Sequence, residues 1–223
     1  NDEKEQIRTY LSGIYNTVIL KDVVQRNKIS DVTGLENIVK FMFDNIGNLC
    51  SSTNIANTMT SNGRKISVPT VEKYLEALVE SFVLYKVPRY DIKGKNYLTI
   101  GAKYYLSDVG LRYYLLGNKN KDEGNILENV VYLELLRRGY NIYIGKNDDN
   151  EVDFVAINEK GEEYYQVSLT VKDEKTLERE LKPLNNINDH NPKYLLTRDD
   201  ILQQRDGIIH ANIPEFMLEN KDF

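Results

Sequence analysis

The period of the apolar residues changes at about residue 82, and no other feature of the sequence restricts the fold as strongly. Upstream, apolar side chains recur every three to four residues, as in the stripe from Leu35 to Ile46, which is typical of helices packed on a core. Downstream, residues 82–87 and 96–100 are rich in β-branched and aromatic residues, and a turn over residues 91–95 separates them. The expected fold class is therefore α+β or α/β, with helices first and a β-hairpin next.

Three short helices are expected before the hairpin, after a helical leader and linker over residues 1–31. Ser51 and Ser67 stand at the starts of the second and third helices, where a hydroxyl group can cap free backbone N–H groups. Three helices followed by a hairpin with lysines at its tip are the pattern of a winged helix-turn-helix, which we place at residues 32–116. The third helix would be its recognition helix.

The charge of the chain is uneven, although its formal total is −5. Residues 60–103 carry eight basic and four acidic residues, whereas residues 104–223 carry 15 and 23. The basic segment covers the third helix and the hairpin, so the winged helix is expected to neutralise DNA phosphates. The side chains expected to do so are Arg64, Lys65, Lys73, Arg89, Lys93 and Lys95. Glutamates on the same helix would repel phosphate, which leaves protein contacts as the alternative: Glu72, Glu76 and Glu80.

A second domain is expected over residues 117–223, with the element order α-β-β-β-α-β. Its expected elements are a helix at 125–138, strands at 140–144, 151–157 and 163–169, a helix at 173–187 and a strand at 193–197. The separate charge balance of this region agrees with a domain of its own.

Polar side chains on two of these strands form the candidate chemical site. Alternation places Glu151 and Asp153 on one face of their strand, and Gln166 and Ser168 share a face of the next. Carboxylate oxygens on adjacent elements are the ligands that Mg²⁺ prefers. Ordinary amphipathic strands with solvated polar faces are the alternative interpretation.

These residues resemble the PD-(D/E)xK, or restriction-endonuclease-like, fold: a helix with Glu128, a strand pair with Asp153, and Gln-x-Ser where the family has Glu-x-Lys. Five stretches together resemble the predicted archaeal and bacterial AAA-type ATPases: YLSGIYNTVILKDVV, ISVPTVEKYLEALVESFVLYKVPRYD, KYYLSDVGLRYYLLG, LENVVYLELLRRGYNIYIGK and EVDFVA...YYQVS. The resemblance covers nearly the whole chain. It implies an N-terminal P-loop ATPase, then a winged helix and an endonuclease-like domain of unknown function.

Two departures from that family limit what the chain is expected to do. The phosphate-binding motif G-x-x-x-x-G-K-[ST] is absent, and residues 1–31 correspond by resemblance to the end of the ATPase region, so ATP is expected only in the missing domain of the parent protein. When the family's site is carried over to this sequence, Glu128 and Asp153 match its acidic positions and would hold Mg²⁺. Gln166 stands at the second acidic position of the strand motif, and Ser168 stands at the lysine position. Glutamine brings no charge and serine cannot replace the lysine, so we expect a degenerate, inactive nuclease site. Three cationic side chains at or near the start of the next helix could substitute for the lysine: Lys172, Lys175 and Arg179.

The expected function is therefore the ATPase-free C-terminal part of an AAA-type protein. One alternative is a protein-interaction module that oligomerises or controls the ATPase, and another is an active Mg²⁺-dependent nuclease. Expected partners are DNA, the ATPase domain of the same full-length protein and a second copy of the chain. The only cysteine, Cys50, fits a reducing cytoplasm, and no stretch approaches the length of a membrane span.

Overall fold

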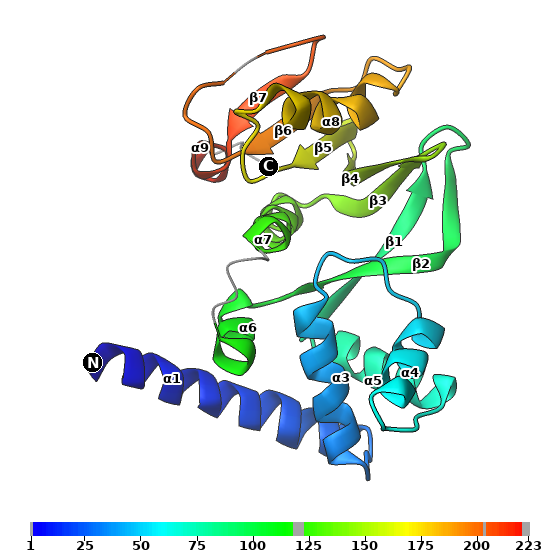
Figure 1. Ribbon diagram of the computed structural model, residues 1–223, viewed down its shortest axis with the longest axis vertical. Coiled ribbons are helices and arrows are strands. Elements are labelled where there is room, and N and C mark those ends of the chain that lie inside the picture. The colour runs from blue at the N-terminus through cyan, green and yellow to red at the C-terminus, as the bar shows by residue number, and fades with distance from the viewer. Residues whose placement is uncertain (1, 118–122, 203, 220–223) are drawn as a thin grey trace. The chain divides into compact units, whose positions relative to one another are not determined.

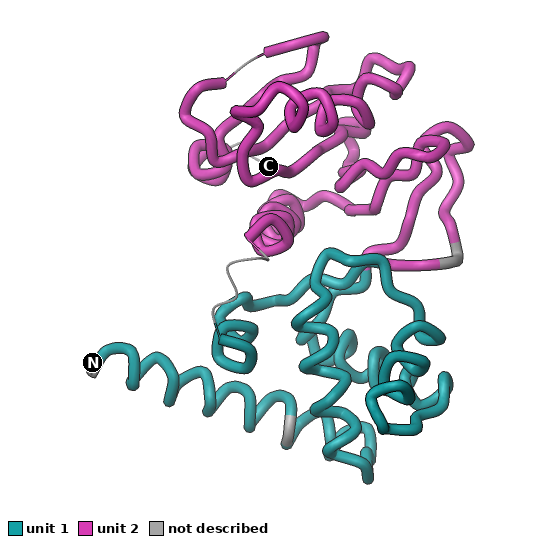
Figure 2. Tube along the Cα trace, viewed as in Figure 1, with its two compact units in different colours: residues 1–86, 103–120 teal, residues 87–102, 121–223 magenta. Residues whose placement is uncertain are grey.

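The computed structural model describes residues 2–117, 123–202 and 204–219. Two compact units share the chain: residues 1–86 and 103–120 form the first, and residues 87–102 and 121–223 form the second (Figure 2). The hairpin therefore belongs to both units, because its tip clusters with the second unit rather than with the helices before it. The expected boundary between the two domains adjoins residues 118–122, which lie outside the described residues.

The first unit is built from helices whose starts are capped as the sequence indicates. Helix α1 (Asp2–Ile14) continues through a π-helical stretch η1 (Tyr15–Val23) into α2 (Val24–Arg26), and then follow α3 (Val32–Asp44), α4 (Ser52–Ser61), α5 (Val68–Glu80) and, after the hairpin, α6 (Val109–Leu116) (Figure 1). The hydroxyl groups of Ser51 and Ser67 accept hydrogen bonds from the backbone N–H groups of Asn54 and Thr70. The three helices expected from apolar spacing are thus confirmed as helices.

The core of the first unit consists of the apolar faces of these helices. Helix α3 packs on α5 and α6, and α4 packs on α5. Their fully buried or nearly fully buried side chains include Leu35, Ile38, Val39, Met42, Phe43, Ile55, Val71, Leu75 and Leu78. These are the residues of the stripes with helical spacing, so burial of apolar area accounts for the packing.

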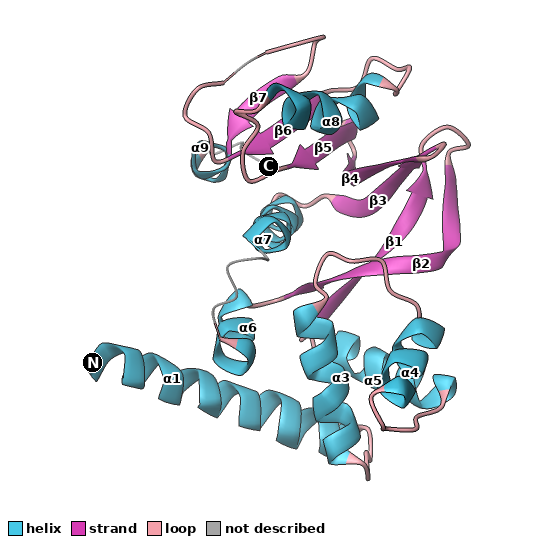
Figure 3. Ribbon diagram, in the orientation of Figure 1, coloured by secondary structure: helices cyan, strands magenta, loops and turns pink. Residues whose placement is uncertain are grey.

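Among the described residues, seven strands form one mixed sheet in the order β2-β1-β3-β4-β5-β6-β7. Strands β3, β4 and β5 pair antiparallel, whereas β1 pairs parallel with β3, β6 with β5, and β7 with β6. The strand bounds are β1 (Leu84–Asp91), β2 (Asn96–Leu106), β3 (Asn141–Asn147), β4 (Asn150–Asn158), β5 (Gly161–Val167), β6 (Lys193–Thr197) and β7 (Ile209–Asn212) (Figure 3).

The second unit has the expected element order, because α7 (Glu123–Arg137), β3, β4, β5, α8 (Glu174–Asn185) and β6 follow one another. Two elements were not expected: β7 and the short helix α9 (Ile213–Leu218). Helix α7 packs on one face of the sheet, where the ring of Tyr132 meets Phe154. Helix α8 packs on the opposite face, against a core that contains Val155 and Tyr164. The fold is therefore a mixed α/β fold.

No helix in the described parts of the chain is both long and apolar enough to cross a membrane.

Candidate functional site

Asp153 and Gln166, two of the residues singled out in the sequence, lie side by side in the second unit. Asp153 is on β4 and Gln166 on β5, next to the paired residues Phe154 and Tyr165. The backbone N–H of Asp153 donates to Oε1 of Gln166 at 3.4 Å, and Oδ2 of Asp153 accepts from the backbone N–H of Val167 at 2.8 Å. The structure therefore brings these two predicted residues together.

Both side chains are buried, with 9% of Asp153 and 8% of Gln166 exposed. The alternative interpretation, amphipathic strands with solvated polar faces, does not hold here, because helices cover the sheet on both faces. On β4, every residue from Val152 to Ala156 is buried. Buried polar groups need hydrogen-bond partners, which explains why these two side chains are held so closely.

Glu180 on α8 completes the cluster, and the sequence reasoning missed it. Nε2 of Gln166 donates to Oε2 of Glu180 at 3.0 Å, and only 9% of Glu180 is exposed. Its other oxygen, Oε1, accepts hydrogen bonds from the guanidinium group of Arg179, at 2.7 Å and 3.1 Å. A signal existed in the sequence: Glu180 occupies a helical position between Leu177 and Leu184 that faces the core. We call Asp153, Gln166 and Glu180 the buried polar cluster.

The amide of Gln166 explains how Asp153 and Glu180 are linked through hydrogen bonds, while Arg179 balances the charge of Glu180 from outside the cluster. A carboxylate at position 166 would place a second negative charge about 3 Å from Glu180, which raises the pKa of one group or requires a cation between them. The amide instead accepts a hydrogen bond at its oxygen and donates one from its nitrogen. Hydrogen bonds therefore link the elements that a metal ion would link in a carboxylate site.

The other predicted residues of the nuclease-like site have different surroundings. Glu128 is buried on α7. Ser168 lies beyond the end of β5, where its hydroxyl group donates to the backbone oxygen of Thr170 at 3.3 Å. In the described parts of the chain, no group of three or more His, Cys, Asp or Glu side chains could hold a metal ion. Metal binding by Asp153 and Glu128 stays a prediction.

Of the cations that could replace the missing lysine, Arg179 reaches the buried polar cluster, through Glu180. Lys172 lies 3.9 Å from a carboxylate oxygen of Asp199 instead. Arg179 is exposed and its partner is buried, so its charge offsets that of Glu180 from the solvent side.

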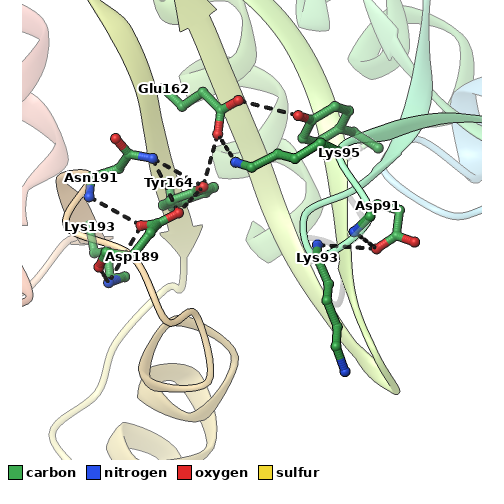
Figure 4. A network of polar contacts seen from close by, with 10 residues as sticks. Asp91, Lys93, Lys95, Glu162, Tyr164, Asp189, Asn191 and Lys193 are labelled. Atoms are coloured by element: carbon green, nitrogen blue, oxygen red, sulfur yellow. Dashed lines mark hydrogen bonds and ion pairs between the residues drawn. The ribbon is translucent and has the colours of Figure 1, made fainter.

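The two lysines at the hairpin tip, predicted to contact DNA, form ion pairs within the second unit. Nζ of Lys95 lies 2.5 Å from Glu162, and Nζ of Lys93 lies 3.2 Å from Asp148. Glu162 also accepts hydrogen bonds from the hydroxyl groups of Tyr90 and Tyr164 (Figure 4). Burial and the charge of Glu162 raise the pKa of Tyr90 to about 12, so this phenol remains a donor at neutral pH.

The remaining predicted DNA contacts differ in their availability. Arg64 is paired with Asp31 at 2.5 Å, and this hydrogen bond is the main reason why the pKa of Asp31 is lowered. Arg89 is half-buried on β1. Lys65 and Lys73 are exposed, and neither has an ion pair with a residue that the structure describes.

Comparison with known proteins gives the family of the chain. A family model described as a domain of unknown function (DUF8612) matches residues 1–122, which is more than half of the chain. The chain belongs to the DUF8612 family. A second model, a domain of unknown function (DUF4143), matches residues 123–216 of this DUF8612 member. The hairpin tip lies inside the DUF8612 match, although it clusters with the second unit.

Two curated relatives of this DUF8612 member come from a bacterium and an archaeon. An uncharacterized protein of Haemophilus influenzae is 37% identical over 212 residues, which cover 95% of this chain and 52% of the relative. An uncharacterized protein of Methanocaldococcus jannaschii is 33% identical over 187 residues, which cover 82% of this chain and 40% of the relative. The chain thus spans about half the length, or less, of these relatives. No solved structure matches it significantly.

Proposed function

We propose that the chain is the ATPase-free C-terminal part of an AAA-type ATP-binding protein, and that its second unit is a nuclease-like module without catalytic activity. The sequence stretches quoted above resemble such proteins over nearly the whole chain. A DUF4143 domain is often found with AAA ATPases. About half of the Haemophilus influenzae relative lies outside the matched region, which is enough for one nucleotide-binding domain of ordinary size.

The proposal interprets the two units at a finer level than the fold class. Helices α3, α4 and α5 followed by the β1–β2 hairpin support a winged helix-turn-helix in the first part. The order α7-β3-β4-β5-α8-β6, with Asp153 on β4 and Gln166 on β5, supports a PD-(D/E)xK-like frame in the second.

The observation that carries the loss of catalysis is the hydrogen-bonded amide of Gln166. A metal-dependent nuclease needs carboxylates that are free to hold Mg²⁺ and a cation that stabilises charge on the phosphate. Here the amide links Glu180 to β4, and Ser168 stands in place of the lysine. These hydrogen bonds occupy the oxygen and nitrogen of the Gln166 amide and one oxygen of Glu180, and the two oxygens would otherwise be open to a metal ion.

A cleavage assay tests this part of the proposal. The chain and its Asp153→Ala variant are incubated with supercoiled plasmid and with single-stranded DNA, in the presence of Mg²⁺ or Mn²⁺. We expect equal, background-level cleavage from both proteins. Cleavage that disappears in the Asp153→Ala variant would establish the alternative, an active Mg²⁺-dependent nuclease.

ATP binding tests the relation to the missing domain. The full-length Haemophilus influenzae relative is expected to bind ATP in equilibrium dialysis, whereas the present chain is expected to bind none, since it has no phosphate-binding motif. A relative that binds no ATP would contradict the AAA-type assignment.

For the winged helix-turn-helix proposed at residues 32–116, DNA contact and protein contact are both candidate functions, and two observations support protein contact. The hairpin lysines and Arg64 are already paired with carboxylates. Helix α5 carries three exposed glutamates where a recognition helix would approach phosphate. Exposed Lys65 and Lys73 remain the observation in favour of DNA.

A further inference from the structure

Helix α1 exposes large apolar side chains along its first turns. Every residue from Glu3 to Tyr10 is exposed, and this stretch includes Ile7 and Tyr10, of which 53% and 69% are exposed. Tyr113 on the neighbouring helix α6 is also exposed, at 40%. Apolar side chains that gather on a protein surface are typical of a contact site for another molecule, so this region is a candidate interaction surface.

Helices α1 and α6 lie side by side in the first unit and form a groove between them (Figure 1). The groove has a volume of about 430 Å³, and six described residues line it: Lys4, Ile7, Arg8 and Leu11 of α1, and Tyr113 and Tyr114 of α6. The four residues of α1 recur at positions i, i+3, i+4 and i+7, so they share one face of the helix. We call this feature the α1–α6 groove.

Contacts between the two helices fix the floor of the α1–α6 groove. The hydroxyl group of Tyr114 donates to Oγ of Ser12 at 3.0 Å, and the rings of Tyr114 and Tyr15 have their centroids 6.0 Å apart. A Cβ atom added at Gly110 would lie 3.5 Å from Cδ2 of Leu11, so the start of α6 approaches α1 closely. The groove is therefore formed in the chain alone, and a partner could bind it without first rearranging the two helices.

The charges of the α1–α6 groove indicate the chemistry of its partner. Lys4 and Arg8 are exposed and lie one helical turn apart, and neither forms an ion pair with a described side chain. Of the described residues that line the groove, none is acidic, although acidic residues outnumber basic ones in the whole chain by 34 to 29. Like charges one turn apart repel each other, and a carboxylate placed beside them would relieve that repulsion.

We propose that the α1–α6 groove binds an acidic amphipathic helix of a partner protein. Leucine and phenylalanine side chains of that helix would pack on Ile7 and Leu11. Its glutamates would pair with Lys4 and Arg8. Four of the six lining residues are apolar, which favours such a helix over the phosphate backbone of DNA. The groove is separate from the buried polar cluster and does not depend on the proposed function.

The test is an NMR titration of the full chain with the acetylated and amidated peptide EALEAFLEALLEA, which places its glutamates beside one apolar stripe. Saturable shifts are expected for the backbone amides of α1 and α6. The chain has a formal charge of −5, so its overall field opposes the binding of an acidic peptide. The peptide QALQAFLQALLQA should bind about fivefold more weakly, and KALKAFLKALLKA more weakly still. Equal binding of the three peptides would overturn the proposal.

Two double variants separate pairing in the groove from general attraction. The double variant Lys4→Gln, Arg8→Gln should weaken binding of the glutamate peptide about fivefold. The double variant Lys21→Gln, Lys40→Gln removes the same charge from exposed positions that do not line the groove, and it should change binding less than about twofold. Equal losses in the two double variants would refute the site.

The variant Ile7→Gln examines the apolar contact. Glutamine keeps a good helix propensity and Ile7 is already half-exposed, so the thermal midpoint should stay close to that of the parent chain. Binding of the glutamate peptide should weaken about tenfold, because the buried apolar area of the contact is lost. The matched control Ile201→Gln, at a position of the second unit that is 78% exposed, should bind as the parent chain does. Unchanged binding by Ile7→Gln would contradict the proposal.

Two further measurements address other occupants of the groove. In sedimentation velocity, Ile7→Gln should leave the oligomeric state of the chain unchanged. A dimer that dissociates in this variant would assign the groove to a second copy of the chain and overturn the proposal. Duplex DNA should not displace the glutamate peptide. Displacement, together with loss of DNA binding in Lys4→Gln, Arg8→Gln, would assign the groove to DNA instead.

Discussion

Gln166 holds β5 to both of its neighbours in the buried polar cluster, through its oxygen to β4 and through its nitrogen to α8. Its partner Glu180 is buried, and a buried carboxylate that loses a hydrogen bond keeps the full cost of its desolvation. The stability of the second unit should therefore depend on this one amide far more than on an exposed one.

The variant Gln166→Ala should lower the free energy of unfolding by about 2–3 kcal/mol, because it leaves Glu180 without its amide donor. Urea unfolding monitored by circular dichroism measures the change. The control Gln25→Ala, at an exposed position, should change it by less than about 0.5 kcal/mol. If both variants lowered the free energy of unfolding by a similar amount, the hydrogen bond between Gln166 and Glu180 would contribute no specific stability.

The variant Gln166→Glu changes the charge but hardly the shape of the same side chain. Two adjacent carboxylates raise the folded-state pKa of the pair, so stability is greatest below the pKa of an unfolded glutamate and falls as pH rises through the raised value. We expect a lower thermal midpoint at pH 8 than at pH 5, and recovery at pH 8 on addition of Mg²⁺. A midpoint that does not respond to Mg²⁺ would show that position 166 cannot contribute to a metal site.

Among the elements, the hairpin tip and the end of the sheet are held by different kinds of contact. At the tip, Lys95 and Glu162 form an ion pair whose side chains are 51% and 21% exposed, whereas Lys93 and Asp148 are 70% and 67% exposed. Water screens the second pair more strongly. At the other end, His210 on β7 is buried and its Nε2 lies 2.8 Å from the hydroxyl group of Thr197 on β6.

The two ion pairs at the tip should differ in strength. Double-mutant cycles with alanine are expected to give a coupling energy of about 1 kcal/mol for Lys95 with Glu162, and about 0.2–0.5 kcal/mol for Lys93 with Asp148. Chemical denaturation of the four proteins of each cycle measures the coupling. Equal values would indicate that the hydrogen bonds of Glu162 to tyrosines add nothing to the pair.

His210 should make the second unit sensitive to mild acid. Burial lowers the pKa of His210, although Asp199 opposes this shift. Protons then bind preferentially to the unfolded chain as pH falls through about 6.5, so stability should decline between pH 7 and pH 5.5. The variant His210→Gln should flatten this part of the pH profile in thermal unfolding, and an unchanged slope would exclude His210 as its source.

For the whole molecule, the distribution of paired and unpaired cations sets how strongly any DNA binding depends on salt. If all six predicted residues contacted phosphates, the logarithm of affinity would fall with the logarithm of salt concentration with a slope of about −5, at about −0.9 per phosphate contact. Lys65 and Lys73 are the exposed members without an ion pair to a described residue. They alone would give a slope of about −2.

We therefore expect a slope near −2 in fluorescence anisotropy titrations of duplex DNA between 50 and 200 mM salt. Over this range of salt, such a slope corresponds to a loss of affinity of roughly tenfold or more, which the titration can measure. The double variant Lys65→Ala, Lys73→Ala should abolish the dependence, whereas Lys93→Ala, Lys95→Ala should leave it nearly unchanged. A slope near −5 would mean that the hairpin lysines leave their carboxylate partners to bind DNA.

Local sequence patterns predicted the helices and strands, which depend on neighbouring residues. They did not predict the strand pairing and side-chain contacts that join segments distant in sequence. Spacing of apolar residues and capping serines located α3, α4 and α5, and alternation located β3 to β5. The parallel pairing of the hairpin strand β1 with β3 joins segments far apart in sequence, and no local pattern signals it. Glu180 was missed for the same reason, since its role depends on Gln166 across the space between a helix and a strand.

The pairing of β1 with β3 determines how this protein can be divided for expression. A fragment that begins where the DUF4143 match begins, at residue 123, would lack β1 and remove the pairing partner of Ile144, Gly145 and Lys146 on β3. Ile144, which is fully buried, lies in this stretch, so the newly opened edge would be prone to pair with other copies. Aggregation of such a fragment would result from the choice of its first residue and not from low stability of the DUF4143 domain itself. A fragment that also includes residues 84–106 would keep β1 paired with β3.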